Sequence, residues 1–231
     1  MPTGTTLPDL RAVLFDVDGT LVDSIEAVVL GIADTVEVFL GQRPDDASVR
    51  NLIGVPLRQQ MRIYGATEEQ IPAMVSDCIV RLEGYGHLET PHQPAIDMLK
   101  LAHDRGLRTA LVTSKSHAEV VPFLERFSGA AAVETVVCAS DVQHPKPDPE
   151  SARLACARLG VETHQAALVG DSIYDLRCAR DAGVFAIAVA YGAASREALA
   201  AEEPDLLFDT SEALLAWAHT ALPTNTCPVR S

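Results

Sequence analysis

The sequence predicts an α/β protein in which a parallel sheet carries helices on both faces and a small all-helical segment follows the first strand. From about Pro94 onward, short apolar runs alternate with helical patterns, as expected for parallel strands joined by crossover helices. One further apolar run lies near the N-terminus, and residues 23–93, which separate it from the others, show no strand pattern. A composition of 48% hydrophobic and 22% charged residues is typical of a folded globular protein.

The first apolar run, residues 12–15, has the character of a buried parallel strand. It ends in Asp16 and Asp18, after which Gly19 predicts a turn. From Ile25 to Leu40 apolar residues recur at helical spacing, and Gly41 follows as a stop signal. Asp23, with Glu26 three positions later, resembles a capping box at the start of this helix.

The rest of the insert predicts three shorter helices, over residues 47–53, 57–64 and 71–82, the last with Pro72 near its start. Five later strands are predicted over residues 108–112, 133–138, 166–169, 184–189 and 206–208. We therefore expect a Rossmann-like core made by residues 1–22 and 94–231, and a helical domain made by residues 23–93.

Charge and cysteine content narrow the function classes. Lys and Arg number 18 against 32 Asp and Glu, a formal charge of −14, and no basic run is present. This argues against nucleic acid and against anionic membranes as partners. The N-terminus resembles no signal peptide and no apolar stretch is long enough to span a bilayer, so we expect a cytoplasmic protein. The five cysteines have no paired spacing, which favours reduced, buried thiols.

The pair Asp16 and Asp18 is the first candidate for chemistry. In open α/β sheets ligands bind beyond the carboxyl ends of the strands, where this pair would lie. Two like charges so close are costly unless a cation or a proton separates their roles. One arrangement that meets this condition is a metal-bound carboxylate nucleophile beside a carboxyl group that shuttles protons. The structural alternative is a solvated Asp-Gly turn.

Two later strand ends supply groups suited to phosphate. Thr113 and Ser114 follow the strand at 108–112, and a hydroxyl and a backbone N–H there can hold a phosphate oxygen, although capping of the next helix explains them too. Lys146 lies between Pro145 and Pro147, whose rigid backbone lets a lysine place its charge beside a phosphoryl group. An exposed loop lysine is the alternative.

A fourth strand end carries two more carboxylates. Asp171 and Asp175 follow the apolar run at 166–169, at the start of a predicted helix. Helix N-termini favour carboxylates for structural reasons, so capping explains either one. Hard oxygen ligands such as Asp16 and Asp171 also suit Mg²⁺.

The order of these four motifs resembles the haloacid dehalogenase-like superfamily of phosphohydrolases. The resemblance covers nearly the whole chain, and the helical insert matches the cap domain of that family. The matching pieces are Asp16-Val17-Asp18-Gly19-Thr20, Thr113, Lys146 and Gly170-Asp171-Ser172-Ile173-Tyr174-Asp175. Other local sequences are most similar to the phosphoglycolate phosphatase and pyrophosphatase branch: Leu21-Val22-Asp23-Ser24, Val112-Thr113-Ser114-Lys115, Lys146-Pro147-Asp148-Pro149 and Ala182-Gly183-Val184.

The resemblance implies a phosphatase mechanism. Asp16 would attack phosphorus and become an aspartyl phosphate, while Asp18 would protonate the leaving oxygen and then activate water. Mg²⁺ would be held by the Asp16 carboxylate, the Asp18 backbone carbonyl and Asp171.

The remaining site residues follow from the same resemblance. Thr113, the Ser114 N–H and Lys146 would stabilise the transferring phosphoryl group. Asp175 would orient Lys146 or a metal-bound water. A cationic pocket made by Mg²⁺ and Lys146 would explain how a very acidic protein binds an anion.

Asp18 also discriminates within the superfamily, because dehalogenases and phosphonate-cleaving members lack an acid at its position. The sequence therefore favours hydrolysis of a phosphate ester or anhydride. A phosphosugar mutase with the same motifs is the first alternative, and a non-enzymatic phospho-acceptor domain is a second.

Substrate choice is expected in the cap, where Arg58 is the residue chosen for contact with the remote part of the substrate and Arg62 is its competitor. A solvated arginine on a short helix explains Arg58 equally well. Phosphoglycolate, pyrophosphate and sugar phosphates all match the motifs.

Overall fold

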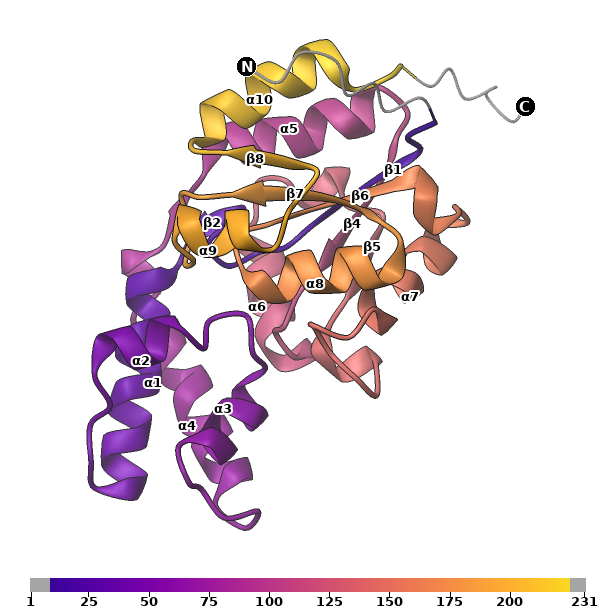
Figure 1. Cartoon of the computed structure of the whole chain (residues 1–231). Coiled ribbons are helices and arrows are strands. Elements are labelled where there is room, and N and C mark those ends of the chain that lie inside the picture. Colours follow the sequence, from indigo (N-terminus) through magenta and orange to yellow (C-terminus); the bar gives the residue numbers. More distant parts are fainter. Residues whose placement is uncertain (1–8, 225–231) are drawn as a thin grey trace.

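The computed structural model describes residues 9–224 and contains a six-stranded parallel sheet with helices on both faces (Figure 1). Across the sheet the order is β5-β4-β1-β6-β7-β8, so the N-terminal strand lies at the centre between β4 and β6. The predicted fold class is confirmed. The strands are β1 (Ala12–Phe15), β4 (Arg108–Val112), β5 (Thr135–Val137), β6 (Ala166–Gly170), β7 (Phe185–Val189) and β8 (Leu206–Phe208).

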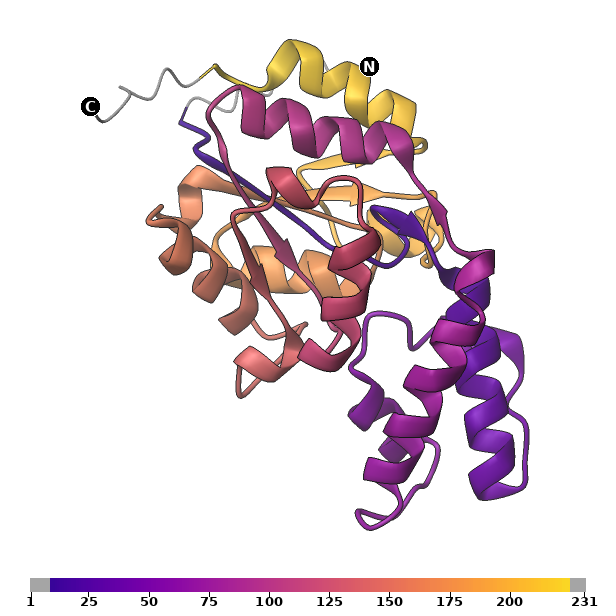
Figure 2. The same cartoon turned by 180° about the vertical axis from the view of Figure 1, so that it is seen from behind.

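The apolar run of β1 is continuous because both faces of the sheet are covered. Val13 and Phe15 pack in the cluster that includes α5 (Gln93–Asp104) and α10 (Ser211–Ala221). Ala12 and Leu14 pack on the other face, in the cluster that includes α7 (Glu150–Leu159) and α8 (Ile173–Ala182). Figure 2 shows α5 and α10 lying side by side over one face of the sheet.

The strand predicted over residues 133–138 is shorter in the structure. Val133 caps the 3-10 turn Ala130–Ala132 and Cys138 caps the 3-10 turn Ala139–Asp141, and between them β5 retains only Thr135–Val137. The remaining elements of the core are α6 (His117–Arg126), the 3-10 turn Thr163–Gln165 and α9 (Arg196–Ala201).

The insert forms a separate helical lobe beside the sheet, drawn in indigo and violet in Figure 1. It has its own apolar core, to which α1, α3 and α4 contribute residues such as Ile32, Met61 and Met74. Pro72 lies in the first turn of its helix, where a missing N–H costs little. The helices are α1 (Ile25–Leu40), α2 (Asp46–Arg50), α3 (Leu57–Ile63) and α4 (Ile71–Gly84), followed by the 3-10 turn Gly86–Leu88.

Two features of the insert differ from expectation. Residues 23–93 do contain strand: β2 (Val22–Asp23) pairs antiparallel with β3 (Thr90–Pro91) where the chain enters and leaves the lobe. Two residues are too few to produce a periodic pattern. The predicted capping box of Asp23 and Glu26 is wrong, because α1 begins after Ser24 and has no side-chain cap. The Ser24 hydroxyl donates to Asp18 Oδ1 instead, at 2.6 Å.

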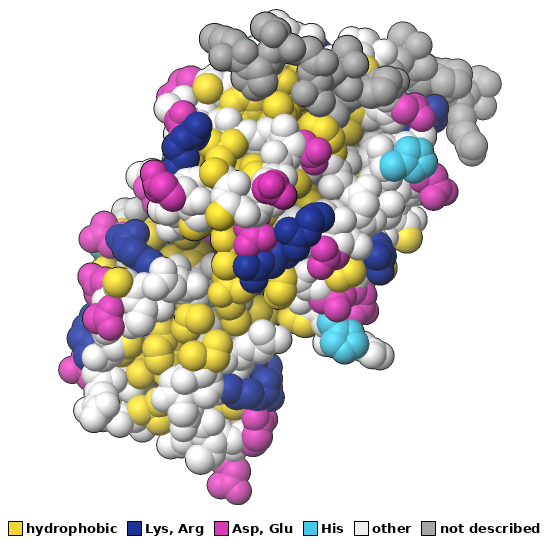
Figure 3. Space-filling model, in the orientation of Figure 1, with side chains coloured by type: hydrophobic (Ala, Val, Ile, Leu, Met, Phe, Trp, Pro, Cys, Tyr) yellow, Lys and Arg dark blue, Asp and Glu magenta, His cyan; other side chains and the backbone are white. Residues whose placement is uncertain are grey.

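The cysteines and charges agree with the sequence where the structure describes them. Cys78, Cys138, Cys156 and Cys178 are buried free thiols, and Cys227 lies outside the described residues. Figure 3 shows acidic and basic side chains interspersed over one face, without a continuous basic patch there. Within residues 9–224, each helix is too short or too polar to cross a bilayer.

Candidate active site

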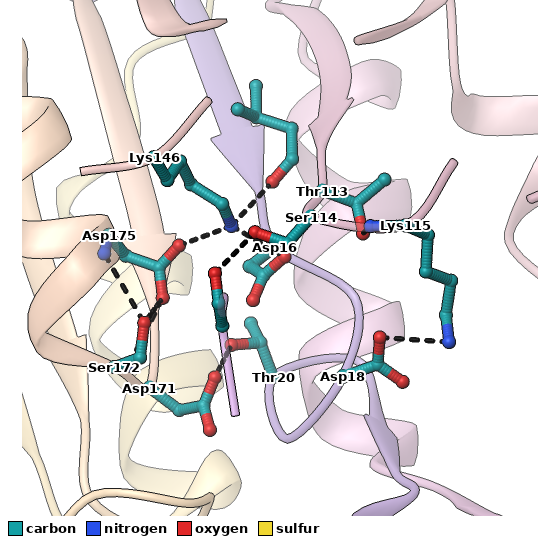
Figure 4. Close-up of polar contacts among 12 residues, drawn as sticks. Asp16, Asp18, Thr20, Thr113, Ser114, Lys115, Lys146, Asp171, Ser172 and Asp175 are labelled. Carbon is teal, nitrogen blue, oxygen red and sulfur yellow. Dashed lines mark hydrogen bonds and ion pairs between the residues drawn. The ribbon is translucent and has the colours of Figure 1, made fainter. Parts of the chain in front are cut away.

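The four polar strand ends predicted from the sequence meet at one edge of the sheet (Figure 4). Asp16 directly follows β1, Thr113 follows β4 and Asp171 follows β6. Because β4 and β6 are the two neighbours of β1, the three carboxyl ends adjoin. Lys146 reaches the same point from the loop before α7.

Lys146 is a buried cation between two buried carboxylates. Its Nζ lies 2.9 Å from Asp16 Oδ1 and 2.6 Å from Asp175 Oδ1, and it donates to the Val112 carbonyl at 3.1 Å. Burial alone would lower the pKa of Lys146, but the carboxylates of Asp16 and Asp175 outweigh it and raise that pKa. The residue is 2% exposed, so it is not the exposed loop lysine that the sequence also allowed.

Asp175 serves the helix and the ion pair at once. Its Oδ2 accepts hydrogen bonds from the backbone N–H and the hydroxyl of Ser172, which completes a capping box for α8. Its Oδ1 accepts from Lys146. Asp175 therefore caps α8 with one carboxylate oxygen and pairs with Lys146 through the other, and its role in catalysis stays a prediction.

The Asp171 carboxylate is held by two hydrogen bonds and is packed closely against the backbone of two glycines. Its Oδ1 accepts from the Thr20 hydroxyl at 3.0 Å and its Oδ2 from the Ala193 N–H at 2.7 Å. A Cβ atom at Gly19 or Gly192 would collide with this carboxylate, and Gly19 also has a φ of +76°. Glycine at these two positions lets the backbone lie close to the Asp171 carboxylate. The cap of α8 is made by Ser172 and Asp175, so capping does not explain Asp171.

The carboxylates of Asp16, Asp171 and Asp175 form a cluster that could hold a metal ion. One ligand atom from each lies within 4.8 Å of the others, and all three residues are buried. Burial raises the pKa of Asp16 to about 7, and the charge of Asp175 adds to this effect. Burial also raises the pKa of Asp171 well above its ordinary value, with Asp16 contributing. Lys146 alone does not balance the three charges, and a hard divalent cation fits this oxygen donor set.

Asp18, two residues from Asp16, points to a different partner. Figure 4 shows its carboxylate turned toward Lys115 and away from the Asp16 cluster. The Lys115 Nζ lies 2.9 Å from Asp18 Oδ2, while Ser24 holds Oδ1. Burial alone would lower the pKa of Lys115, but Asp18 and Glu119 outweigh it and raise that pKa. The two carboxylates of the motif therefore have separate environments.

The sequence offers Lys115 as a lesser candidate for substrate contact, and the distribution of lysines gives a further signal for it. The chain has only three lysines, and two of them, Lys115 and Lys146, are at this edge. The other cations of the chain are 15 arginines, so lysine is rare in this sequence and two of the three lie at this edge. The Lys115 side chain is 13% exposed, and its backbone N–H donates to Thr113 Oγ1 at 3.2 Å. Thr113 is itself buried.

The helical lobe closes over the cluster through the loop before α3. The Ser114 hydroxyl donates to the Gly54 carbonyl at 2.5 Å, and the Tyr174 hydroxyl donates to the Asn51 carbonyl at 3.3 Å. A small cavity of about 40 Å³ remains beneath this loop. From the core it is lined by Asp16, Asp18, Ser114, Lys115 and Glu119, and from the lobe by Val28, Ile53, Gly54, Val55, Leu57, Gln60 and Leu82.

The lobe residues that line this cavity are not the ones the sequence singled out. Arg58 is exposed on α3, while Leu57 and Gln60 of the same helix line the cavity. Arg62 pairs with Glu68 on the surface. Contact between Arg58 and a substrate stays a prediction. Gln60 had no sequence signal, because only the tertiary contact with the core distinguishes it from Gln59.

The family model described as haloacid dehalogenase-like hydrolase matches residues 13–189. The chain belongs to this family, and it is a phosphatase of the haloacid dehalogenase type. It is 32% identical to the pyrophosphatase PpaX of Bacillus velezensis, over 89% of this chain and 95% of the relative. It is 31% identical to a phosphoglycolate phosphatase of Salmonella paratyphi A, over 90% of this chain and 92% of the relative.

Solved structures agree on the fold. A predicted phosphatase from Clostridium acetobutylicum superposes with a TM-score of 0.78 at 25% identity, covering 90% of this chain and 97% of that one. CbbY from Rhodobacter sphaeroides, solved in complex with phosphate, gives 0.76 at 23% identity, covering 89% and 96%. The second likeness establishes the shared architecture alone.

Proposed function

We propose that the chain is a Mg²⁺-dependent phosphohydrolase that cleaves a small phosphorylated metabolite through an aspartyl phosphate on Asp16. The observation that carries this proposal is the placement of Asp16. It is a buried carboxylate at the end of the central strand, beside Lys146 and two further carboxylates. It also lines the cavity between the sheet and the helical lobe.

Asp16 and Asp171 would hold Mg²⁺ together with the backbone carbonyl of Asp18. When bound, the ion supplies positive charge beside the transferring phosphoryl group and lets neighbouring carboxylates ionise together. The raised pKa values of Asp16 and Asp171 support a cation here, because both shifts come from burial and from carboxylate neighbours. Asp175, already engaged by Lys146 and Ser172, would orient that lysine or a bound water.

The protein groups divide the reaction between them. Asp16 forms a bond to phosphorus as the bond from phosphorus to the leaving oxygen breaks. Lys146, the Thr113 hydroxyl and the Ser114 N–H bind the oxygens of the phosphoryl group. Asp18 gives a proton to the leaving oxygen and later takes one from the water that hydrolyses the aspartyl phosphate. Both transfers require Asp18 to turn from Lys115 toward the reacting oxygen.

We propose that residues 23–93 act as a cap on a core made by residues 1–22 and 94–231. The short ladder of β2 and β3, where the two parts join, is suited to a hinge. Closure excludes bulk water from the site and brings the wall of the lobe over the leaving group. Arg58 stays a candidate for contact with a longer substrate.

The test is phosphate release over a panel of phosphorylated metabolites that includes pyrophosphate, phosphoglycolate and sugar phosphates. We expect release in Mg²⁺, its loss in EDTA, and its loss in Asp16→Asn. Release that persists in Asp16→Asn would contradict the assignment of the nucleophile. Interconversion of sugar phosphate isomers without net phosphate release would identify a mutase instead.

A further inference from the structure

Gln60 combines burial, a fixed orientation and an unsatisfied acceptor. The residue lies in α3, is 3% exposed, and lines the cavity that also contains Asp16 and Asp18. Its Nε2 donates to the Val55 carbonyl at 2.7 Å. That bond fixes the amide, since the reverse orientation would set two carbonyl oxygens against each other. The Oε1 atom is buried and has no hydrogen-bond partner.

Buried acceptors without a partner are rare in folded proteins, because burial costs them their hydrogen bonds to water. Three buried side-chain atoms of residues 9–224 are in this state: Gln60 Oε1, Tyr64 Oη and His92 Nε2. Of these three residues, Gln60 is the one that lines the catalytic cavity. A ligand entering the cavity is therefore well placed to supply the missing donor.

The rest of the cavity wall favours a donor over another acceptor. The side chains that the lobe contributes around Gln60 are apolar: Val28, Ile53, Val55, Leu57 and Leu82. On the core side, three carboxylates, those of Asp16, Asp18 and Glu119, line the cavity together with a single lysine, Lys115, which pairs with Asp18 in this structure. The oxygens of these carboxylates and of Gln60 would repel an anionic leaving group. The same oxygens would accept hydrogen bonds from a hydroxyl or an ammonium group.

We propose that Gln60 Oε1 accepts a hydrogen bond from a donor on the leaving group, and that the preferred substrates are phosphate monoesters of alcohols carrying such a donor. The donor is a hydroxyl, as in a polyol, or an ammonium, as in an amino alcohol. This inference rests on the proposed phosphohydrolase function and names the substrate class of the same site. Gln60 is thereby a specificity residue on the wall opposite the nucleophile.

The experiment measures kcat/KM for two matched substrate pairs in Mg²⁺. Glycerol 1-phosphate is compared with propyl phosphate, and ethanolamine phosphate with ethyl phosphate. We expect the donor-bearing member of one pair to be favoured about tenfold, in line with one added hydrogen bond. Gln60→Met, which keeps the length of the side chain, should bring that ratio close to one by lowering kcat/KM more for the donor-bearing substrate than for the donor-free one.

Gln59→Met is the matched control, because Gln59 is exposed on the same helix and should leave both ratios unchanged. A merely structural role for Gln60, through its bond to Val55, would lower kcat/KM for both members of a pair equally and preserve the ratio. The pair that loses its ratio in Gln60→Met identifies the donor as hydroxyl or ammonium.

Three outcomes count against a proposal, and they are distinguishable. Equal ratios in wild type and Gln60→Met overturn the specificity inference. Turnover confined to pyrophosphate or phosphoglycolate overturns it too, since neither offers a comparable alcohol donor, while leaving the phosphohydrolase intact. Absence of Mg²⁺-dependent phosphate release from every compound, with Asp16→Asn indistinguishable from wild type, overturns the proposed function itself.

Discussion

The cavity has two walls of opposite character. The core wall includes Asp16, which clusters with Lys146, Asp171 and Asp175 beyond the cavity lining; this group is charged, buried and closely paired. The cap wall, formed by α3, its preceding loop and parts of α1 and α4, is mostly apolar and holds one unpaired acceptor on Gln60. The difference teaches that the charges suited to phosphoryl transfer lie at the strand ends of the core, whereas the proposed recognition of the leaving group depends on the mostly apolar helical lobe.

The largest expected effect comes from Asp16, the proposed nucleophile on the core wall. Asp16→Asn should lower phosphate release by about 10³-fold or more, since the amide forms no aspartyl phosphate. In the absence of metal, the free energy of unfolding of this variant should not be lower than that of wild type. The change removes a carboxylate whose ionisation is opposed by burial and by Asp175. Initial rates and urea denaturation in EDTA measure the two effects. A variant that unfolds more readily would contradict our account of charge crowding.

Lys146 tests the pairing on the same wall. Lys146→Met leaves Asp16 and Asp175 buried without their shared cation, and should lower the free energy of unfolding by about 3–5 kcal/mol. Adding Asp175→Asn should recover part of this loss, because one uncompensated charge is removed. The measurement is urea denaturation of the single and double variants. Full stability in Lys146→Met would show that the pair carries no structural charge balance.

The pH dependence of the metal-free protein tests the crowding directly. The pKa of Asp16 is raised from an ordinary value of 3.8 to about 7, so the native state favours the protonated carboxyl. Its contribution to stability is complete below pH 3.8 and is lost as pH rises through about 7. In EDTA, wild type should therefore lose stability relative to Asp16→Asn over this range, and Mg²⁺ should restore it. Parallel stability profiles of the two proteins would refute the raised pKa.

The smallest expected effect lies on the cap wall, at Gly54. This residue has a φ of +98°, and a Cβ there would lie 2.9 Å from Tyr174 and 3.0 Å from Ser172 Oγ. Gly54→Ala should cost about 1–3 kcal/mol through backbone strain and should also lower kcat/KM several-fold by displacing the loop.

Gly65 provides the matched control for that prediction. Its φ is +95°, but a Cβ there meets no atom within 4 Å. Gly65→Ala should therefore lose comparable stability while keeping its kcat/KM. Equal kinetic losses in both variants would mean that strain within the lobe, and not contact with the core, accounts for the effect.

Most of the fold and the core wall could be predicted because their signals are local. The core strands are short apolar runs, and candidate residues such as Asp16 and Asp171 follow directly after them, while Lys146 lies in a later loop. Parallel strands bring their carboxyl ends to one edge, so sequence order alone groups these residues. The short ladder of β2 and β3 and the hydrogen bond from Ser24 to Asp18 were missed, because two-residue strands and single side-chain hydrogen bonds leave no periodic trace in the sequence.

The sequence by itself determined the α/β class, the helical insert and the residues of the core wall, because apolar periodicity and strand ends are properties of neighbouring residues. Only the tertiary structure decided that Asp18 turns to Lys115, that Asp175 divides its oxygens between Lys146 and Ser172, and that Gln60 lines the cavity instead of Arg58. The first two of these choices depend on how the loops of the core fold against one another, and the third depends on how the lobe packs against the core. On α3, for example, Gln60 faces the core and lines the cavity while Arg58 is exposed, and only the packing of the helix against the core distinguishes them.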